Sequence, residues 1–332
     1  MEEKNLTIAD IAQALGVSKT TVSRAISGKG RIGEETRRRV LAYIETHHYS
    51  PNVVAKGLAQ NKTFNLGLVL PGDYHIVELP FFQKCMLGIS RAASEAGYDV
   101  LISMVMADNI TQLKRAVTNR KIDGAILTRT LTDDMAMKYL LENRLPFVAV
   151  GRAEDERVVQ VDNDHRSACR EMTSRLLDGG IRRIALIGND ENHIVTRSRM
   201  KGFEDAFAEK RGWSGSRQTF MNVREEREVE RIVEGLLGQG VECVVGMDDF
   251  LCGCVLNALQ KRRAAVPGQV QVVSFYDSTV LENRIPAVTS IRFDVEELGR
   301  TACELLLQML DGEEPKRRTL LGYEVCMRES TR

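Results

Sequence analysis

The segment TIADIAQALGVSKTTVSRAISG, residues 7–28, determines how the N-terminal part of the chain is interpreted. Thr7 and Asp10 have the spacing of a capping box at a helix start, and Gly16 supplies a helix end. Ser18 is placed to cap a second helix directly afterwards. The apolar residues of the first helix recur at intervals of three and four: Ile8, Ile11, Ala12 and Leu15. Two short helices joined by a tight turn predict a helix-turn-helix.

The second helix of this segment carries short polar side chains that fit the major groove of DNA. Its outward positions are predicted to reach base edges and phosphates: Lys19, Thr20, Ser23 and Arg24. Val22 and Ala25 are expected to pack inward. A third helix is expected over residues 34–47, and its apolar side is formed by Val40, Leu41 and Ile44. A purely structural helical hairpin is the alternative, but the second helix is too small and too polar to be a core element.

Charge is distributed unevenly along the chain. Basic and acidic residues balance at 46 each over 332 residues, but residues 1–63 hold ten basic residues against six acidic ones. A basic N-terminal segment suits binding to a polyanion. The seven scattered cysteines form no CxxC pair and no zinc-binding spacing, so we expect reduced thiols and no metal site. The sequence has neither a long apolar run nor a signal-peptide pattern, which predicts a cytoplasmic protein with no membrane partner.

From residue 65 onward, short apolar runs alternate with helical patterns, which is the rhythm of a parallel α/β sheet. The runs expected to form strands are residues 66–70, 100–105, 125–127, 147–150, 184–187, 243–245 and 270–275. Gly97, Gly180 and Gly240 each stand shortly before one of these runs, where helix-ending glycines belong. Because so many strands exceed one comfortable sheet, we expect an α/β body of two lobes.

Three motifs in the first sixty residues, TVSRAIS, TRRRV and YSPNVVAKGLA, resemble the lactose repressor and galactose repressor family of bacterial transcriptional regulators. The resemblance implies a homodimer whose heads each read half of a near-palindromic operator on double-stranded DNA. It divides the chain into an all-α helix-turn-helix head at residues 1–49, a hinge helix and linker at 50–62, and an effector-binding and dimerisation domain at 63–332. The alternative for residues 50–62 is a plain linker.

The resemblance also assigns DNA contacts outside the second helix. It places Leu58 as a wedge between base steps of the minor groove, with Ala55 and Lys56 along that groove. The hinge is too short to be stable alone, so it is expected to fold only on DNA. Arg37 and Arg39 are expected mainly to brace the head and to touch phosphates. The complete set expected to contact DNA is Thr7, Ser18, Lys19, Thr20, Thr21, Ser23, Arg24, Lys29, Asn52, Ala55, Lys56 and Leu58.

Residues 65–332 resemble the family's regulatory domain, which is similar to the two-lobed periplasmic-binding-protein-like (type I) fold. The resemblance implies chain crossovers near residues 161, 291 and 321, with the ligand between the lobes at the carboxyl ends of the strands. Arg199 in RMKGF matches an arginine that binds ligand hydroxyls or acids, and we expect its side chain to be solvated without ligand. Phe81 and Phe82 are expected to stack on the ligand, with core packing as the alternative for one of them. The other expected pocket residues are Arg152, Asn163 and Asp248.

Three positions depart from the family's pattern. Met247 replaces a polar ligand contact, Tyr276 replaces an acid, and Phe293 adds a further apolar ring. If all three face the cleft, a small and fully hydroxylated monosaccharide has unpaired polar groups there, which is costly. An oligosaccharide, a glycoside with an apolar part or a non-sugar metabolite fits better. The alternative is that these side chains pack away from the cleft.

Catalysis and cofactors are not expected. The sequence holds no dinucleotide-binding, phosphate-binding, nucleophile-elbow or metalloprotease motif, and its five histidines do not cluster. A solute-binding protein without a role in DNA regulation is inconsistent with the head. The sequence therefore predicts a sequence-specific transcriptional regulator, acting as a dimeric repressor of sugar-utilisation genes under a carbohydrate or glycoside effector. The identity of the effector, the operator sequence and the direction of the ligand's effect stay open.

Overall fold

The computed structural model describes residues 6–28, 30–47, 49, 57–58, 60–72 and 80–332, in two compact units, Met1–Thr63 and Phe64–Arg332. The first unit contains α1 (Ile8–Leu15), α2 (Lys19–Ser27) and α3 (Glu34–Thr46). The expected capping box is confirmed, since the Thr7 hydroxyl accepts from the Asp10 amide and the Asp10 carboxylate accepts from the Thr7 amide. The Ser18 hydroxyl caps α2 by accepting from the Thr21 amide at 3.1 Å. Gly16 ends α1 in the left-handed conformation at φ 65°.

The core of the head is small and lies where the three helices meet. Its buried residues are Ile11, Ala12, Val22, Ala25 and Val40. Ile44 is partly buried against this core, but Leu41 is 45% exposed, so its expected place on the apolar side of α3 is wrong. The reason is that α1 and α2 cover only a narrow face of α3, and a residue one step from Val40 is rotated by about 100° out of it.

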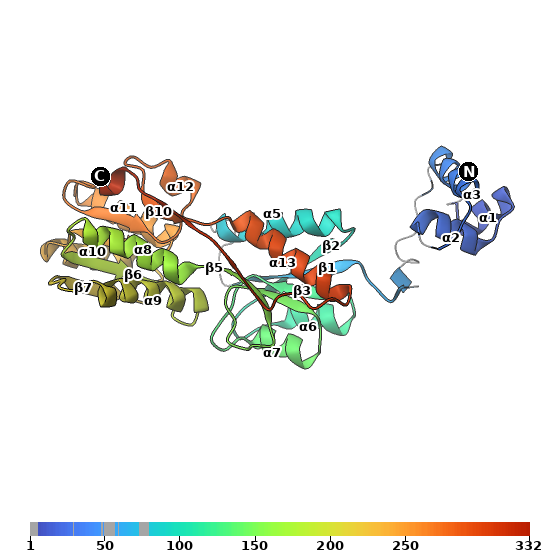
Figure 1. Cartoon of the computed structure of the whole chain (residues 1–332). Helices are drawn as coiled ribbons and strands as arrows, with labels where there is room; N and C mark the ends of the chain where they lie inside the picture. The colour runs from blue at the N-terminus through green and yellow to red at the C-terminus, as the bar shows by residue number, and fades with distance from the viewer. Residues whose placement is uncertain (1–5, 29, 48, 50–56, 59, 73–79) are drawn as a thin grey trace. The chain divides into compact units, whose positions relative to one another are not determined.

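The second unit consists of two α/β lobes (Figure 1). The first lobe contains β1 (Asn65–Pro71), α5 (Pro80–Glu95), β2 (Asp99–Val105), α6 (Thr111–Thr118), β3 (Gly124–Leu127), α7 (Met135–Glu142), β4 (Phe147–Val150), β5 (Val159–Asn163), α13 (Val295–Leu310) and β11 (Arg318–Leu321). Its parallel sheet has the strand order β11-β5-β4-β3-β1-β2.

The second lobe has the same architecture. It contains α8 (His165–Asp178), β6 (Arg183–Ile187), α9 (Ile194–Glu209), β7 (Ser216–Phe220), α10 (Glu226–Gly238), β8 (Cys243–Gly246), α11 (Asp249–Lys261), β9 (Gln271–Ser274), α12 (Thr279–Glu282), β10 (Thr289–Arg292), β12 (Glu324–Cys326) and the 3-10 helix η2 (Glu329–Thr331). The strand order is β12-β10-β9-β8-β6-β7, and β12 alone among these strands runs antiparallel to its neighbour. The chain crosses between lobes after β5, β10 and β11, close to the expected positions.

Glycines bring one helix pair very close in each lobe. In the first lobe α5 and α13 lie side by side although they are far apart in the chain (Figure 1). A Cβ added at Gly88 would collide with the Glu296 carbonyl oxygen, and one added at Gly299 would collide with that of Cys85. In the second lobe a Cβ at Gly202 of α9 would collide with the Arg166 carbonyl oxygen of α8. These pairs fix the helices that carry cleft residues.

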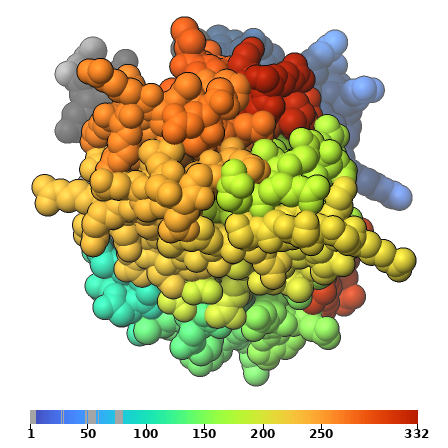
Figure 2. Space-filling model, turned by 90° about the vertical axis from the view of Figure 1, so that its left-hand side faces the viewer, coloured from blue at the N-terminus to red at the C-terminus, as the bar shows by residue number. Residues whose placement is uncertain are grey.

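The C-terminal residues are bound into the second lobe. Figure 2 shows them in red at the surface, beside the orange segment that precedes them in this lobe. The Arg328 guanidinium binds both carboxylate oxygens of Asp277 at 2.9 Å and also donates to the Ser290 hydroxyl at 2.6 Å. The buried Ser330 hydroxyl donates to the Val272 carbonyl at 2.6 Å. These bonds join the chain end to β9 and β10.

The described part of the chain contains no helix that is long and apolar enough to cross a membrane. The seven cysteines are unpaired, and six of them are buried. In the described part of the chain, no three acidic, histidine or cysteine side chains are grouped so that they could hold a metal ion.

Candidate functional site

The exposed face of α2 presents the side chains expected to read DNA. Lys19, Thr20, Ser23 and Arg24 are all exposed, whereas Val22 and Ala25 are buried in the core of the head. Thr21 is half-buried and its hydroxyl lies 2.8 Å from that of the capping residue Ser18, so it acts in the cap. Thr7 and Ser18 are exposed at the starts of α1 and α2. Helix N-termini of this kind direct amide groups toward phosphates.

The remaining expected DNA contacts lie largely outside the described residues. This applies to Lys29, Asn52, Ala55 and Lys56. Leu58 is described, and its apolar side chain is 85% exposed. An exposed leucine in a segment expected to enter a minor groove suits a wedge between base steps.

Two of the three arginines of α3, Arg38 and Arg39, have structural partners. Arg39 donates to the Leu15 carbonyl at 3.3 Å, which ties α3 to the end of α1. Arg38 pairs with Glu35 on the same helix at 2.5 Å, with both side chains exposed. A surface pair of this type adds little stability.

A cavity of about 150 Å³ lies between the two lobes of the second unit. The residues that line it are Pro80, Phe81, Phe82, Thr128, Arg129, Thr130, Val150, Gly151, Asp162, His165, Asn189, His193, Val195, Thr196, Arg199, Asp248, Asp249, Tyr276 and Leu298. Most of them follow the carboxyl ends of strands, where the fold places ligands. Five of the nine residues expected to bind the effector are among them, namely Phe81, Phe82, Arg199, Asp248 and Tyr276.

Arg199 lies on α9, one turn before Gly202, and the close contact of Gly202 with α8 holds it over the cavity. Its guanidinium donates to the Met247 carbonyl at 2.8 Å and lies 5.9 Å from the centre of the Tyr276 ring. The residue is only 8% exposed. The expectation of a solvated side chain is therefore wrong, because backbone and ring contacts replace most of its water.

Aromatic rings form one end of the cavity. Phe81 from the first lobe meets Tyr276 from the second edge-on at 6.3 Å, and Phe82 packs against Phe81 at 5.2 Å. Phe293 is stacked on Tyr276 at 6.4 Å and contacts His165 edge-on at 4.6 Å. Burial raises the pKa of the Tyr276 phenol above its usual value.

Four of the expected effector residues are not part of the cavity wall described above. Arg152 is exposed outside it. Met247 is fully buried and reaches the site only through its carbonyl. For this residue the alternative is therefore correct: its side chain packs away from the cleft. Phe293 is 7% exposed and supports Tyr276 from behind. Asn163 is 2% exposed, and both polar atoms of its amide have no hydrogen-bond partner within the described structure.

The structure also brings together polar groups that sequence reasoning missed. His165 and His193, which are far apart in the chain, line the same cavity. Asp162, Asn189 and Asp249 join them. The signal that would have found Asp162 and Asn189 is their position at the carboxyl end of a strand, or directly after it, in VDND and LIGND.

Burial shifts the pKa values of three titratable groups in the cavity. Burial raises the pKa of Asp162 to about 7, against the opposing effects of the Asn163 amide and Arg199. Burial, with the charge of Asp248, raises the pKa of Asp249 to about 6. Burial and Arg199 hold the pKa of His165 well below its usual value, so its contact with Asp162 at 3.6 Å joins a neutral ring to a carboxyl group. This cavity offers many donors and acceptors with little net charge at neutral pH.

Comparisons with known proteins match both units. The model described as bacterial regulatory proteins, lacI family, matches residues 7–52, and the model of a periplasmic binding protein-like domain matches residues 173–331. The transcriptional regulator MalR of Streptococcus pneumoniae is 28% identical over 345 residues, which cover 98% of this chain and 97% of the relative. The chain belongs to the LacI family.

Solved structures of this family share the fold over nearly the whole length. A complex of the transcriptional regulator CelR with cellobiose is 27% identical, with a TM-score of 0.72 over 98% of this chain and 99% of the other. A lac repressor dimer bound to its operator has a TM-score of 0.80 at 22% identity, covering 99% of both chains. The present LacI-family chain is accordingly a DNA-binding transcriptional regulator with the two-lobed effector domain.

The raised pKa of Asp162 predicts a specific pH dependence of stability. The pKa of an aspartate in the unfolded chain is about 3.9. Between pH ~4 and ~7 the folded protein therefore binds more protons at this carboxyl than the unfolded chain does, and the carboxyl's contribution to the unfolding free energy falls as pH rises. Asp162→Asn removes that effect. Between pH 5 and pH 8 the unfolding free energy of the natural protein should therefore fall, relative to that of the variant, by at least ~1 kcal/mol. Urea unfolding at both pH values measures it, and a pH-independent difference would contradict the assignment.

Proposed function

We propose that this LacI-family regulator is a repressor that takes a neutral carbohydrate of more than one ring, or a glycoside, as its effector. The observation that carries the proposal is the pairing of an aromatic end with a polar remainder whose positive and negative charges nearly balance, in one cavity. Phe81 and Tyr276 provide ring surfaces for the apolar face of a sugar. Arg199, Asn189 and Asp248 provide donors and acceptors for hydroxyl groups.

The cavity's polar groups support a hydroxylated ligand over a purely apolar one. Asn189 donates to Asp248 at 2.7 Å, and Asp248 also accepts the Leu251 amide at 2.8 Å, so both side chains are held in fixed positions. Preorganised groups bind a ligand without a further ordering cost. The CelR relative binds cellobiose, a neutral carbohydrate, in the same fold. Because the Met247 side chain does not reach the cavity, a single hydroxylated ring has fewer unfavourable contacts than the sequence suggested.

Calorimetric titration of cellobiose, maltose and their monosaccharides tests the effector class. We expect the natural protein to bind a disaccharide more tightly than a monosaccharide. Tyr276→Ala should weaken that binding about fivefold, because a ring contact contributes roughly 1 kcal/mol, while Tyr276→Phe keeps the ring and should bind almost normally. The absence of heat with all these sugars, or equal affinity in both variants, would contradict the proposal.

The exposed face of α2 predicts which substitutions change operator recognition. An operator selected from random DNA by repeated binding to the full chain serves as the probe. Arg24→Ala and Lys19→Ala should each weaken binding to it by ~1 to 3 kcal/mol, and binding to unrelated DNA much less, because they remove base contacts. Arg38→Ala is the control with an exposed arginine outside α2. Fluorescence anisotropy at fixed salt measures the affinity for the operator and for unrelated DNA. Equal losses of affinity for the two DNAs would contradict the assignment.

The second unit exposes apolar side chains that suit a homodimer. In the first lobe they lie on α5 and the edge strand β2, at Leu87, Leu101 and Ile102. In the second lobe they lie at the start of α11 and around α12, at Phe250, Val280 and Ile285, which is 99% exposed. We infer that a second copy covers both patches in a two-fold arrangement, so that both lobes contribute to the interface.

Sedimentation velocity at micromolar concentration tests this interface. Ile102→Asp places a charge at the proposed contact and should shift the protein from dimer to monomer. Leu320→Asp is the matched control, because Leu320 is 61% exposed on β11 at the opposite edge of the same sheet. A natural protein that sediments as a monomer, or a control that dissociates as well, would rule out this surface.

A further inference from the structure

The two lobes are joined across the cleft by main-chain contacts as well as by the three covalent crossovers. Leu131 and His193 form an antiparallel bridge. The bridge connects segment 130–132, between β3 and α7, with segment 192–194, which follows β6 and ends on the first residue of α9.

Two hydrogen bonds hold this bridge. The Thr132 amide donates to the Asn192 carbonyl at 2.9 Å, and the Ile194 amide donates to the Thr130 carbonyl at 3.2 Å. Thr130 and Ile194 are both 5% exposed or less, so water competes weakly for the second bond.

The bridge lies away from the crossovers. They leave from β5, β10 and β11, whereas the bridge follows β3 and β6. In the sheets, β4 separates β5 from β3, and β9 and β8 separate β10 from β6. Cavity residues Gly151, Asp248 and Tyr276 follow those intervening strands. The cavity is therefore enclosed between the crossovers and the bridge, and Thr130 and His193 belong to its wall.

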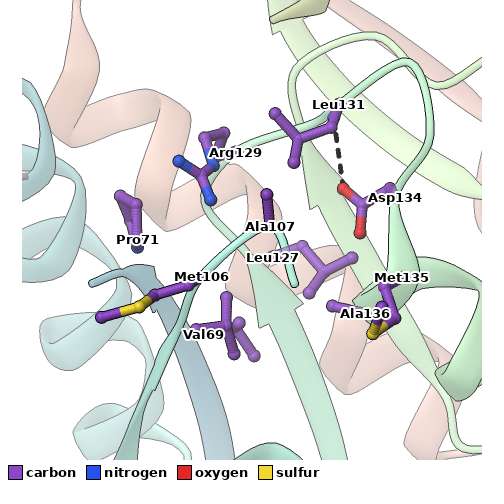
Figure 3. A pocket seen from close by; sticks show the side chains of 11 residues that line it. Val69, Pro71, Met106, Ala107, Leu127, Arg129, Leu131, Asp134, Met135 and Ala136 are labelled. Carbon is purple, nitrogen blue, oxygen red and sulfur yellow. Dashed lines mark hydrogen bonds between the residues drawn. The ribbon is translucent and has the colours of Figure 1, made fainter. Parts of the chain in front are cut away.

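Each half of the bridge is shaped by an aspartate of its own lobe. Figure 3 shows the Asp134 carboxylate directed at Leu131, whose amide it accepts at 3.2 Å. The other oxygen of Asp134 accepts the Met137 amide at 2.9 Å and so caps α7. In the second lobe the Asp190 carboxylate accepts the Asn192 amide at 2.9 Å. Both segments are thus ordered within their lobes before they meet.

We propose that segments 130–132 and 192–194 form a latch that stabilises the lobe arrangement enclosing the effector, with Asp134 as its positioning residue. Rotation of the lobes about the crossovers must separate the latch, since its two halves belong to different lobes. A ligand that contacts both Thr130 and His193 strengthens the latch, and by reciprocity the latch strengthens ligand binding by the same factor. This second statement rests on the proposed effector function, whereas the existence of the latch does not.

Ile194→Pro tests the latch with little effect on α9. Ile194 is the first residue of this helix, where proline is well tolerated because the helix needs no amide there. The preceding His193 has φ −80° and ψ 126°, the extended conformation that a following proline requires. The substitution removes the amide that donates to Thr130. Ile194→Ala is the matched control, because it shortens the side chain and keeps the amide.

Hydrogen exchange of the full chain, followed by mass spectrometry, measures the outcome in peptides covering residues 129–134. We expect faster exchange there in Ile194→Pro than in Ile194→Ala, because without the bond from residue 194 to the Thr130 carbonyl the Asn192 carbonyl is held less firmly against the Thr132 amide. Affinity for cellobiose, measured by calorimetry, should fall about three- to tenfold in the proline variant relative to the control, as for loss of one hydrogen bond. Equal exchange in both variants would overturn the latch. Failure of the natural protein to bind cellobiose would affect only the effector proposal, since exchange is measured without sugar.

Asp134 is tested in the same way. Asp134→Ala frees the Leu131 amide and should speed exchange of the same peptides, while Asp134→Asn keeps an acceptor and should restore most of the protection. Asp133→Ala is the control, because Asp133 is exposed and pairs only with Lys138 among the contacts described. Unchanged exchange in Asp134→Ala, or no rescue by asparagine, would remove Asp134 from the proposal and leave Ile194→Pro to decide the latch.

Discussion

The buried charge of Arg199 is the constraint around which the cleft is arranged. Removing a guanidinium from water costs several kcal/mol unless polar groups replace its hydration, as the Met247 carbonyl and the Tyr276 ring do here. The same charge lowers the pKa of His165 and opposes the rise of the pKa of Asp162 that burial causes. One cation thus helps to set the protonation of the acids and of the histidine that face a ligand.

Helix α9 links this cation to the rest of the second unit. Its first residue donates across the cleft to Thr130, Arg199 follows on the same helix, and Gly202 packs against α8. Helix α8 in turn begins at His165, directly after the chain has crossed from β5. The ligand site is therefore connected to a crossover through packed helices rather than through a loop alone.

The sequence predicted the elements whose signals are local. Capping by Thr7 and Ser18 and the long apolar strands follow from spacing alone, because a residue's neighbours in the chain determine them. Strands β7 and β11, which have half-exposed, alternating patterns, were not among the expected runs. The buried strands β5 and β10 and the short β12 were not among them either, because polar residues interrupt their apolar runs. The presence of His165 and His193 in one cavity wall and the burial of Met247 were missed for a different reason. They depend on how the chain folds around the cleft, and no short window of sequence contains that information.

This difference explains why DNA binding was easier to infer than the effector. In the head, one helix carries both the inward residue Val22 and the outward residue Arg24, so a single periodicity predicts the core and the recognition face together. In the second unit the wall of the cavity comes from many strand ends, each of which supplies one or two side chains. Substituting a residue such as Tyr276 or Asn189 alters the ligand contacts without changing the apolar runs that form the sheets. Ligand preference in this fold can therefore change while the pattern that specifies the fold stays the same, and the effector must be read from the assembled cleft.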